Sequence, residues 1–201
     1  MKRWVLIGAL CLVAKLFSAP AQVMIIRHAE KESGGDTREL IPKGWERAGA
    51  FTYYFTQTKE LLTYGPPAAI FGAKKSAKYD NSLRIVQTAT PIADYLKLPI
   101  NLDYSEKEPE KIAKFILSNP DYEGKNILIV WHKEGIPCLI EGFGYKAPAC
   151  ADRFDLTYVL TFPAEPESEA IRYAQELMYG DSSHLPFYGT FRSRCPSTKC
   201  R

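Results

Sequence analysis

The sequence predicts an α/β protein, a three-layer sandwich in which a mostly parallel central sheet carries helices on both faces. Short continuous apolar runs at 23–26 and 126–130 are typical of strands buried on both sides. Segments with helical spacing of apolar residues alternate with such runs, as in a parallel sheet with crossover helices. With 201 residues and no internal repeat, the chain is long enough for one domain with a substantial core.

The predicted elements follow one another as strand 23–26, helix 45–62, strand 68–71, helix 83–96, helix 108–117, strand 126–130, helix 136–143 and strand 156–162. Pro42 and Gly44 punctuate the chain before the first helix, and Pro91 permits a kink or a break in the second. The third helix is expected to begin near Pro109, because proline is favoured in a first turn. The last strand is expected because β-branched and aromatic residues are frequent in it.

Residues 1–21 are expected to be a signal peptide that precedes a single domain, 22–201. Lys2 and Arg3 form a positive start, 5–14 is an apolar run, and Ala19-Pro20-Ala21 places small residues at the cleavage positions. The alternative is an uncleaved membrane anchor, but ten apolar residues before Lys15 are too few to span a bilayer comfortably. The protein is therefore expected to be secreted or periplasmic.

Removal of this segment changes the charge balance. It holds three of the 26 basic residues, Lys2, Arg3 and Lys15, and none of the 23 acidic ones. The formal net charge therefore falls from +3 to zero in the mature chain. This balance gives no support for nucleic-acid binding, and no stable membrane insertion is expected once the signal is removed.

The cysteine content agrees with export. Four cysteines remain after Cys11 leaves with the signal, and an even number in an oxidising compartment favours disulfides. They are Cys138, Cys150, Cys195 and Cys200. Local pairing within 138–150 and within 195–200 is the first expectation, while other pairings and four free thiols stay open. The sequence contains no Cys-x-x-Cys pair, so it gives little support for a zinc site built on cysteines.

Basic and imidazole side chains cluster where predicted strands end. Arg27 and His28 directly follow the first strand, and His132 follows the strand at 126–130. Arg84 lies in the first turn of the predicted helix 83–96. Ligands of such sheets bind beyond the carboxyl ends of the strands, so this edge is the expected site.

Three sequence elements carry a resemblance to a known family. They are Arg27-His28-Ala29-Glu30-Lys31, the helix start Arg84-x-x-Gln87-Thr88-Ala89, and His132 after a strand. In this order they resemble the histidine phosphatase (phosphoglycerate-mutase-like) superfamily, as an exported bacterial-type member, over most of the mature chain. The resemblance implies metal-independent, cofactor-free hydrolysis of a small phosphorylated substrate through a phosphohistidine intermediate on His28.

The chemistry of these side chains agrees with that assignment. A phosphomonoester carries nearly two negative charges, and the planar guanidinium groups of Arg27 and Arg84 suit its oxygens. A neutral imidazole can attack phosphorus when a hydrogen bond fixes its other ring nitrogen. His28 is therefore the candidate nucleophile, and Arg27, Arg84 and His132 are the candidate phosphate-binding residues.

The leaving oxygen needs a proton, and the sequence offers three candidate acids. The spacing His132-Lys133-Glu134 resembles one branch of the superfamily and makes Glu134 the expected general acid. In another branch the acid comes from an earlier loop, which would select Glu106 or Glu108.

Two other classes of function stay open at this point. A zinc site of His28, His132 and His184 is one, but Arg27 and Arg84 would then place two positive charges beside a dication. The other is a catalytically idle phosphate-binding or partner-binding module on the same scaffold. Mutase chemistry on this scaffold is a further alternative, which the short and exported chain disfavours. The sequence does not identify the physiological substrate.

Overall fold

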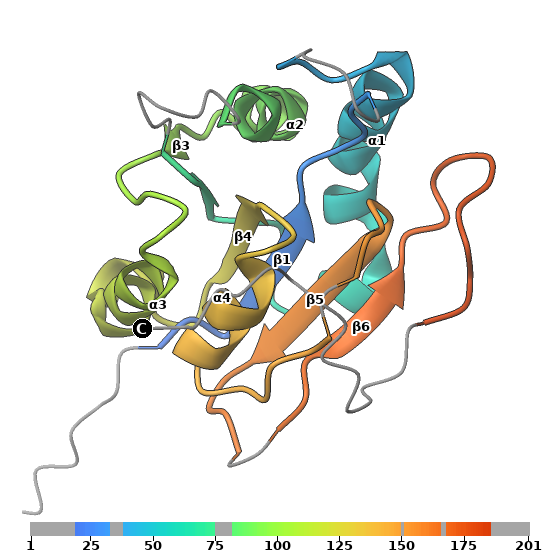
Figure 1. Ribbon diagram of the computed structural model, residues 1–201. Helices are drawn as coiled ribbons and strands as arrows, with labels where there is room; N and C mark the ends of the chain where they lie inside the picture. Colours follow the sequence, from blue (N-terminus) through green and yellow to red (C-terminus); the bar gives the residue numbers. More distant parts are fainter. Residues whose placement is uncertain (1–18, 33–37, 75–81, 150, 166–167, 186–201) are drawn as a thin grey trace, which may run out of the picture.

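The computed structural model describes residues 19–32, 38–74, 82–149, 151–165 and 168–185 (Figure 1). Its helices and strands, in chain order, are β1 (Gln22–Arg27), α1 (Pro42–Gln57), η1 (Lys59–Leu61), β2 (Ala69–Gly72), α2 (Ser82–Leu96), β3 (Ile100–Asn101), α3 (Pro109–Ser118), η2 (Pro120–Tyr122), β4 (Asn126–Trp131), α4 (Ile136–Gly142), β5 (Leu156–Thr161) and β6 (Ile171–Ala174). The predicted α/β class is confirmed.

The strands form one sheet in the order β3-β2-β4-β1-β5-β6. The neighbours β3, β2, β4 and β1 run parallel to one another, whereas β5 runs antiparallel to both β1 and β6. The sheet is therefore mostly parallel, as predicted. In the β1–β4 pair, Arg27 lies opposite Trp131, so the two strands end at the same level.

The helices form two layers, with α1 packed against α2 and α3 packed against α4 (Figure 1). The strand order explains this division. The chain moves in one direction across the sheet from β1 to β2 and β3, and α3 then leads it back to β4. Because crossover connections are right-handed, helices on the outward and return paths cover opposite faces.

The core is built around the two central strands. Every residue of β1 and β4 is buried, as expected of parallel strands covered on both faces. Phe51 and Phe55 of α1 and Ile85 of α2 pack into the same core with no exposed surface. Burial of this apolar area is the main favourable contribution to folding.

Element boundaries differ from prediction at a few places. Helix α1 begins at Pro42, whose fixed φ suits the first turn, and α2 continues through Pro91 without ending. A proline there removes one backbone hydrogen bond, and the packing of both flanking turns holds the helix together. Strands β3 and β6 were not predicted, because β3 has two residues and β6 lacks a buried apolar run.

The residues that precede β1 extend its pairing. The Ala21 amide donates to the Lys125 carbonyl at 2.9 Å, and the Gly124 amide donates to the Ala19 carbonyl at 3.0 Å. The signal segment 1–18 lies outside the described residues, so cleavage near Ala21 stays a prediction. Within the described ranges, no helix is both long and apolar enough to cross a membrane.

One of the four cysteines is placed. Cys138 is buried in α4 and disulfide-bonded. Cys150, Cys195 and Cys200 lie outside the described residues, so the predicted pairings stay predictions.

A buried ionic network connects α1 with the segments that follow β1 and β6. Arg47, only 1% exposed, donates to Glu30 at 2.7–3.0 Å, to Asp181 at 2.6 and 3.0 Å and to Gln175 at 3.0 Å. Burial disfavours the Asp181 carboxylate, but the hydrogen bonds and charge of Arg47 and the hydrogen bonds from the Met178 and Leu177 amides together outweigh it, so the pKa of Asp181 is lowered. Removing one partner would leave a buried charge without its counter-ion.

We expect Asp181→Asn to lower the free energy of unfolding by about 2–3 kcal/mol at neutral pH. Because the folded pKa of Asp181 is lowered, its contribution is present above the ordinary pKa of aspartate and is lost as the pH falls. Urea unfolding at several pH values should therefore show a weaker acid-dependent loss in the variant. Asp121→Asn, at an exposed position in η2, is the control, and equal pH dependence in the two variants would contradict the prediction.

Candidate active site

The two histidines lie side by side at the carboxyl ends of the central strands. His28 follows β1 and His132 follows β4, and the His28 amide donates to the Trp131 carbonyl at 3.0 Å. The ring centroids of His28 and His132 are 5.7 Å apart, with the rings at 73°. The parallel register of β1 and β4 therefore brings both imidazoles to one place.

The tautomer of His28 follows from its neighbour. Its Nδ1 atom lies 2.8 Å from the carbonyl oxygen of Ala29. A carbonyl oxygen only accepts hydrogen bonds, so Nδ1 carries the proton and Nε2 of the neutral ring has the lone pair. Burial lowers the pKa of His28 well below its ordinary value, and the charges of Arg27 and Arg84 act in the same direction. The imidazole is therefore neutral at physiological pH and nucleophilic at Nε2.

Arg27 is buried against an aromatic ring. Its guanidinium carbon lies 3.8 Å from the centroid of the Phe154 ring. The centroid of the same ring lies 5.9 Å from that of the His28 ring. One terminal nitrogen donates to Asp152 at 2.9 Å and to the Arg153 carbonyl at 3.3 Å. The Nε atom is buried and has no hydrogen-bond partner in the part of the chain that the structure describes. Arg27 therefore keeps one buried donor that these contacts do not use.

Arg84 comes from the start of α2 and is 7% exposed. Burial lowers its pKa, and the positive charge of Arg27 lowers it further, while Glu134 opposes the shift. Arginine stays protonated at neutral pH, so two mutually repelling charges share a poorly solvated site. A dianion between them would relieve this repulsion.

His132 contacts one of the candidate acids. Its Nε2 atom lies 3.6 Å from Oε2 of Glu106. Burial lowers the pKa of His132, and the charges of Glu106 and Glu134 oppose this effect. A neutral His132 can donate one hydrogen bond to a phosphoryl oxygen.

The three candidate acids differ in their surroundings. Glu108 accepts hydrogen bonds from Lys111 and from the amide and hydroxyl of Ser105. These hydrogen bonds, that from Lys111 most of all, lower the pKa of Glu108 to about 2. Glu108 is therefore ionised at neutral pH and unsuited to donate a proton. The charge of Glu134 acts on Arg27, Arg84 and His132, whereas that of Glu106 acts on His132.

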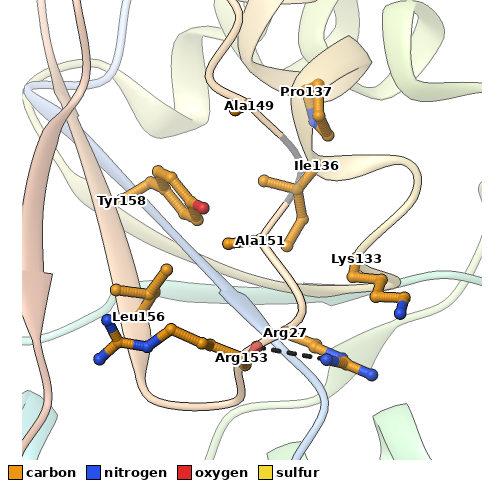
Figure 2. Close-up of a pocket in the computed structure, with 9 residues that line it drawn as sticks. All are labelled: Arg27, Lys133, Ile136, Pro137, Ala149, Ala151, Arg153, Leu156 and Tyr158. Atoms are coloured by element: carbon orange, nitrogen blue, oxygen red, sulfur yellow. Dashed lines mark hydrogen bonds between the residues drawn. The ribbon is translucent and has the colours of Figure 1, made fainter. Parts of the chain in front are cut away.

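A pocket lies beside this group of residues (Figure 2). It is lined by residues of β1, β5, α4 and two loops: Arg27, Lys133, Ile136, Pro137, Ala149, Ala151, Arg153, Leu156 and Tyr158. In Figure 2, Lys133 and Arg27 lie at one end, and the other lining side chains are mostly apolar, with Arg153 and the Tyr158 hydroxyl among them. Since His28, Arg84 and His132 do not line it, this pocket is not where phosphorus would meet the nucleophile.

Sequence reasoning did not find three residues that shape the site. They are Asp152 and Phe154, which contact Arg27, and Thr88, whose hydroxyl accepts from the Ala29 amide at 2.9 Å. The first two follow a loop far from Arg27 in sequence, and no local pattern signals their contact. Thr88 was visible within the helix motif that begins at Arg84, but without an assigned function.

The zinc alternative finds no support in the arrangement of ligands. Across residues 19–32, 38–74, 82–149, 151–165 and 168–185, no group of three or more His, Cys, Asp or Glu side chains could hold a metal ion. His184 is an exposed loop residue whose carbonyl accepts a hydrogen bond from Arg153. It does not complete a triad with His28 and His132.

Neither a family model nor a curated protein matches the sequence. Solved structures do match. The protein histidine phosphatase SixA, complexed with tungstate, matches with a TM-score of 0.51 at 14% identity, over 75% of this chain and 93% of that chain. A mycobacterial glucosyl-3-phosphoglycerate phosphatase with inorganic phosphate matches with a TM-score of 0.49 at 12% identity, over 70% of this chain and 89% of that chain.

Proposed function

We propose that this chain, which has the histidine phosphatase fold, hydrolyses phosphomonoesters through a phosphohistidine on His28. The observation that carries the proposal is the hydrogen bond between His28 Nδ1 and the Ala29 carbonyl. It leaves the Nε2 lone pair for phosphorus, next to His132 and within the field of Arg27 and Arg84. The substrate would be a small phosphorylated molecule, and no metal or other cofactor would be required.

The chemistry takes two steps. Nε2 of His28 attacks phosphorus while the bond to the leaving oxygen breaks, and an acid, proposed to be Glu134, gives that oxygen its proton. Arg27, Arg84 and His132 would bind the non-bridging oxygens as charge develops on them. Water then attacks the phosphohistidine and gives up a proton to the carboxylate. Inorganic phosphate leaves, and neutral His28 is restored.

The proposal also includes export. Residues 1–21 would be removed as a signal peptide, and the 22–201 domain would act in the periplasm or outside the cell. The composition of the first 21 residues and the even number of mature cysteines support this part.

We expect the mature protein to hydrolyse an aryl phosphate in the presence of a chelator, and His28→Ala to abolish this activity. Phosphohistidine is acid-labile, so wild-type protein mixed with labelled substrate should retain label after a base quench and lose it after an acid quench. His184→Ala, an exposed histidine variant, is the matched control and should keep full activity. Full activity in His28→Ala would refute the proposal, and phosphate binding without turnover in the wild type would identify an idle module.

Arg84→Lys should be far from conservative, because a point charge cannot reproduce two parallel hydrogen bonds. We expect kcat/KM to fall by about a hundredfold, which corresponds to about 3 kcal/mol of transition-state stabilisation. Arg172→Lys, in strand β6 at the far edge of the sheet, is the matched control. A kcat/KM within about twofold of the wild type for Arg84→Lys would place Arg84 outside the phosphate site.

The choice between Glu134 and Glu106 can be made with substrates of different leaving groups. If Glu134 is the acid, Glu134→Gln should slow alkyl phosphates strongly and activated aryl phosphates little, since an aryl oxide hardly needs a proton. Glu106→Gln should then slow both classes to a similar degree, through its contact with His132. Glu108→Gln is the control. A leaving-group-dependent loss in Glu106→Gln alone would move the acid to Glu106.

A further inference from the structure

Thr88 of α2 has a hydroxyl group whose two hydrogen bonds join two parts of the site. The hydroxyl oxygen accepts from the Ala29 amide at 2.9 Å and donates to the Arg84 carbonyl at 2.6 Å. Thr88 has no exposed surface, so water does not compete for either bond. Thr88 therefore connects the helix that begins with Arg84 to the loop that carries His28.

The contact continues to the nucleophile through the Ala29 residue. The Ala29 amide is held by Thr88, and the Ala29 carbonyl accepts the proton of His28 Nδ1. A second bond of α2 holds the same loop further on, where the Leu40 amide donates to the Gln87 side chain at 2.9 Å. Helix α2 thus contacts the chain after β1 at Ala29, whose carbonyl orients the imidazole, and again at Leu40.

We propose that Thr88 is a positioning residue, which holds the Ala29 backbone so that His28 presents Nε2 to phosphorus. This inference rests on the proposed function of His28. The inference assigns a function to Thr88, a member of the helix motif that is fully buried. The orientation of the imidazole ring would thus depend on the hydroxyl group of Thr88.

A second threonine on the same helix separates this effect from ordinary helix packing. Thr90 also donates its hydroxyl to the carbonyl four residues earlier, that of Val86, at 2.8 Å. No hydrogen bond described for Thr90 reaches the loop after β1. Thr90 is only partly buried, whereas Thr88 is fully buried. The difference that concerns the site is the Ala29 amide, which would stay buried and unpaired in a Thr88→Val variant.

The experiment compares Thr88→Val, Thr88→Ser and Thr90→Val in the full chain. Thr88→Ser keeps the hydroxyl, and Thr90→Val removes the matched hydroxyl outside the site. Two quantities are measured: kcat/KM for an aryl phosphate, and the His28 tautomer by ¹⁵N NMR of the imidazole ring without substrate. If Thr88→Val does not fold, Thr88→Ala takes its place, with folding checked by thermal unfolding.

We expect Thr88→Val to lower kcat/KM by about ten- to a hundredfold and to add signal from the Nε2–H tautomer of His28. Thr88→Ser and Thr90→Val should stay within about threefold of the wild type, with the Nδ1–H tautomer retained. An unchanged tautomer in Thr88→Val would overturn the inference whatever the activity, since any loss would then be structural. The NMR comparison needs no turnover, so it tests Thr88 even if the wild type proves to be no phosphatase.

Discussion

The parallel pairing of β1 with β4 is the constraint on which the rest of the structure depends. Both strands are buried on both faces and are in register up to Arg27 and Trp131. Their chains therefore leave the sheet together, and the first residue beyond each is a histidine. A shift of this register would separate the imidazole rings, because the strands fix the backbone positions of His28 and His132.

Burial determines the charge states of the side chains at this edge of the sheet. Desolvation lowers the pKa of both imidazoles, and the guanidinium charges of Arg27 and Arg84 add to this effect, whereas Glu106 and Glu134 oppose it at His132. The two arginines stay charged in the same surroundings, since their ordinary pKa is far above neutrality. A site that combines a neutral imidazole at His28 with two permanent cations suits an anion and does not need a low pH to hold it.

The sequence predicted the fold well where the pattern was local. The apolar runs of β1 and β4 and the helical spacing of α2 and α3 needed no knowledge of distant contacts. Strand β3 escaped prediction because two residues carry no periodicity, and β6 because it is partly exposed. Among the candidate site residues, the sequence motif pointed to His28 and Arg84, whereas the stacking of Phe154 on Arg27 depends on a loop that tertiary packing returns to β1.

The geometry of helix α2 explains why the short motif Arg84-x-x-Gln87-Thr88 contributes several side chains to the candidate site. Residues three and four positions apart lie on the same face of a helix, so Arg84, Gln87 and Thr88 all face the same way. Gln87 and Thr88 hold the loop after β1, and Arg84 lies one turn before them. One helix thus carries a proposed phosphate-binding charge and contacts the backbone next to the proposed nucleophile.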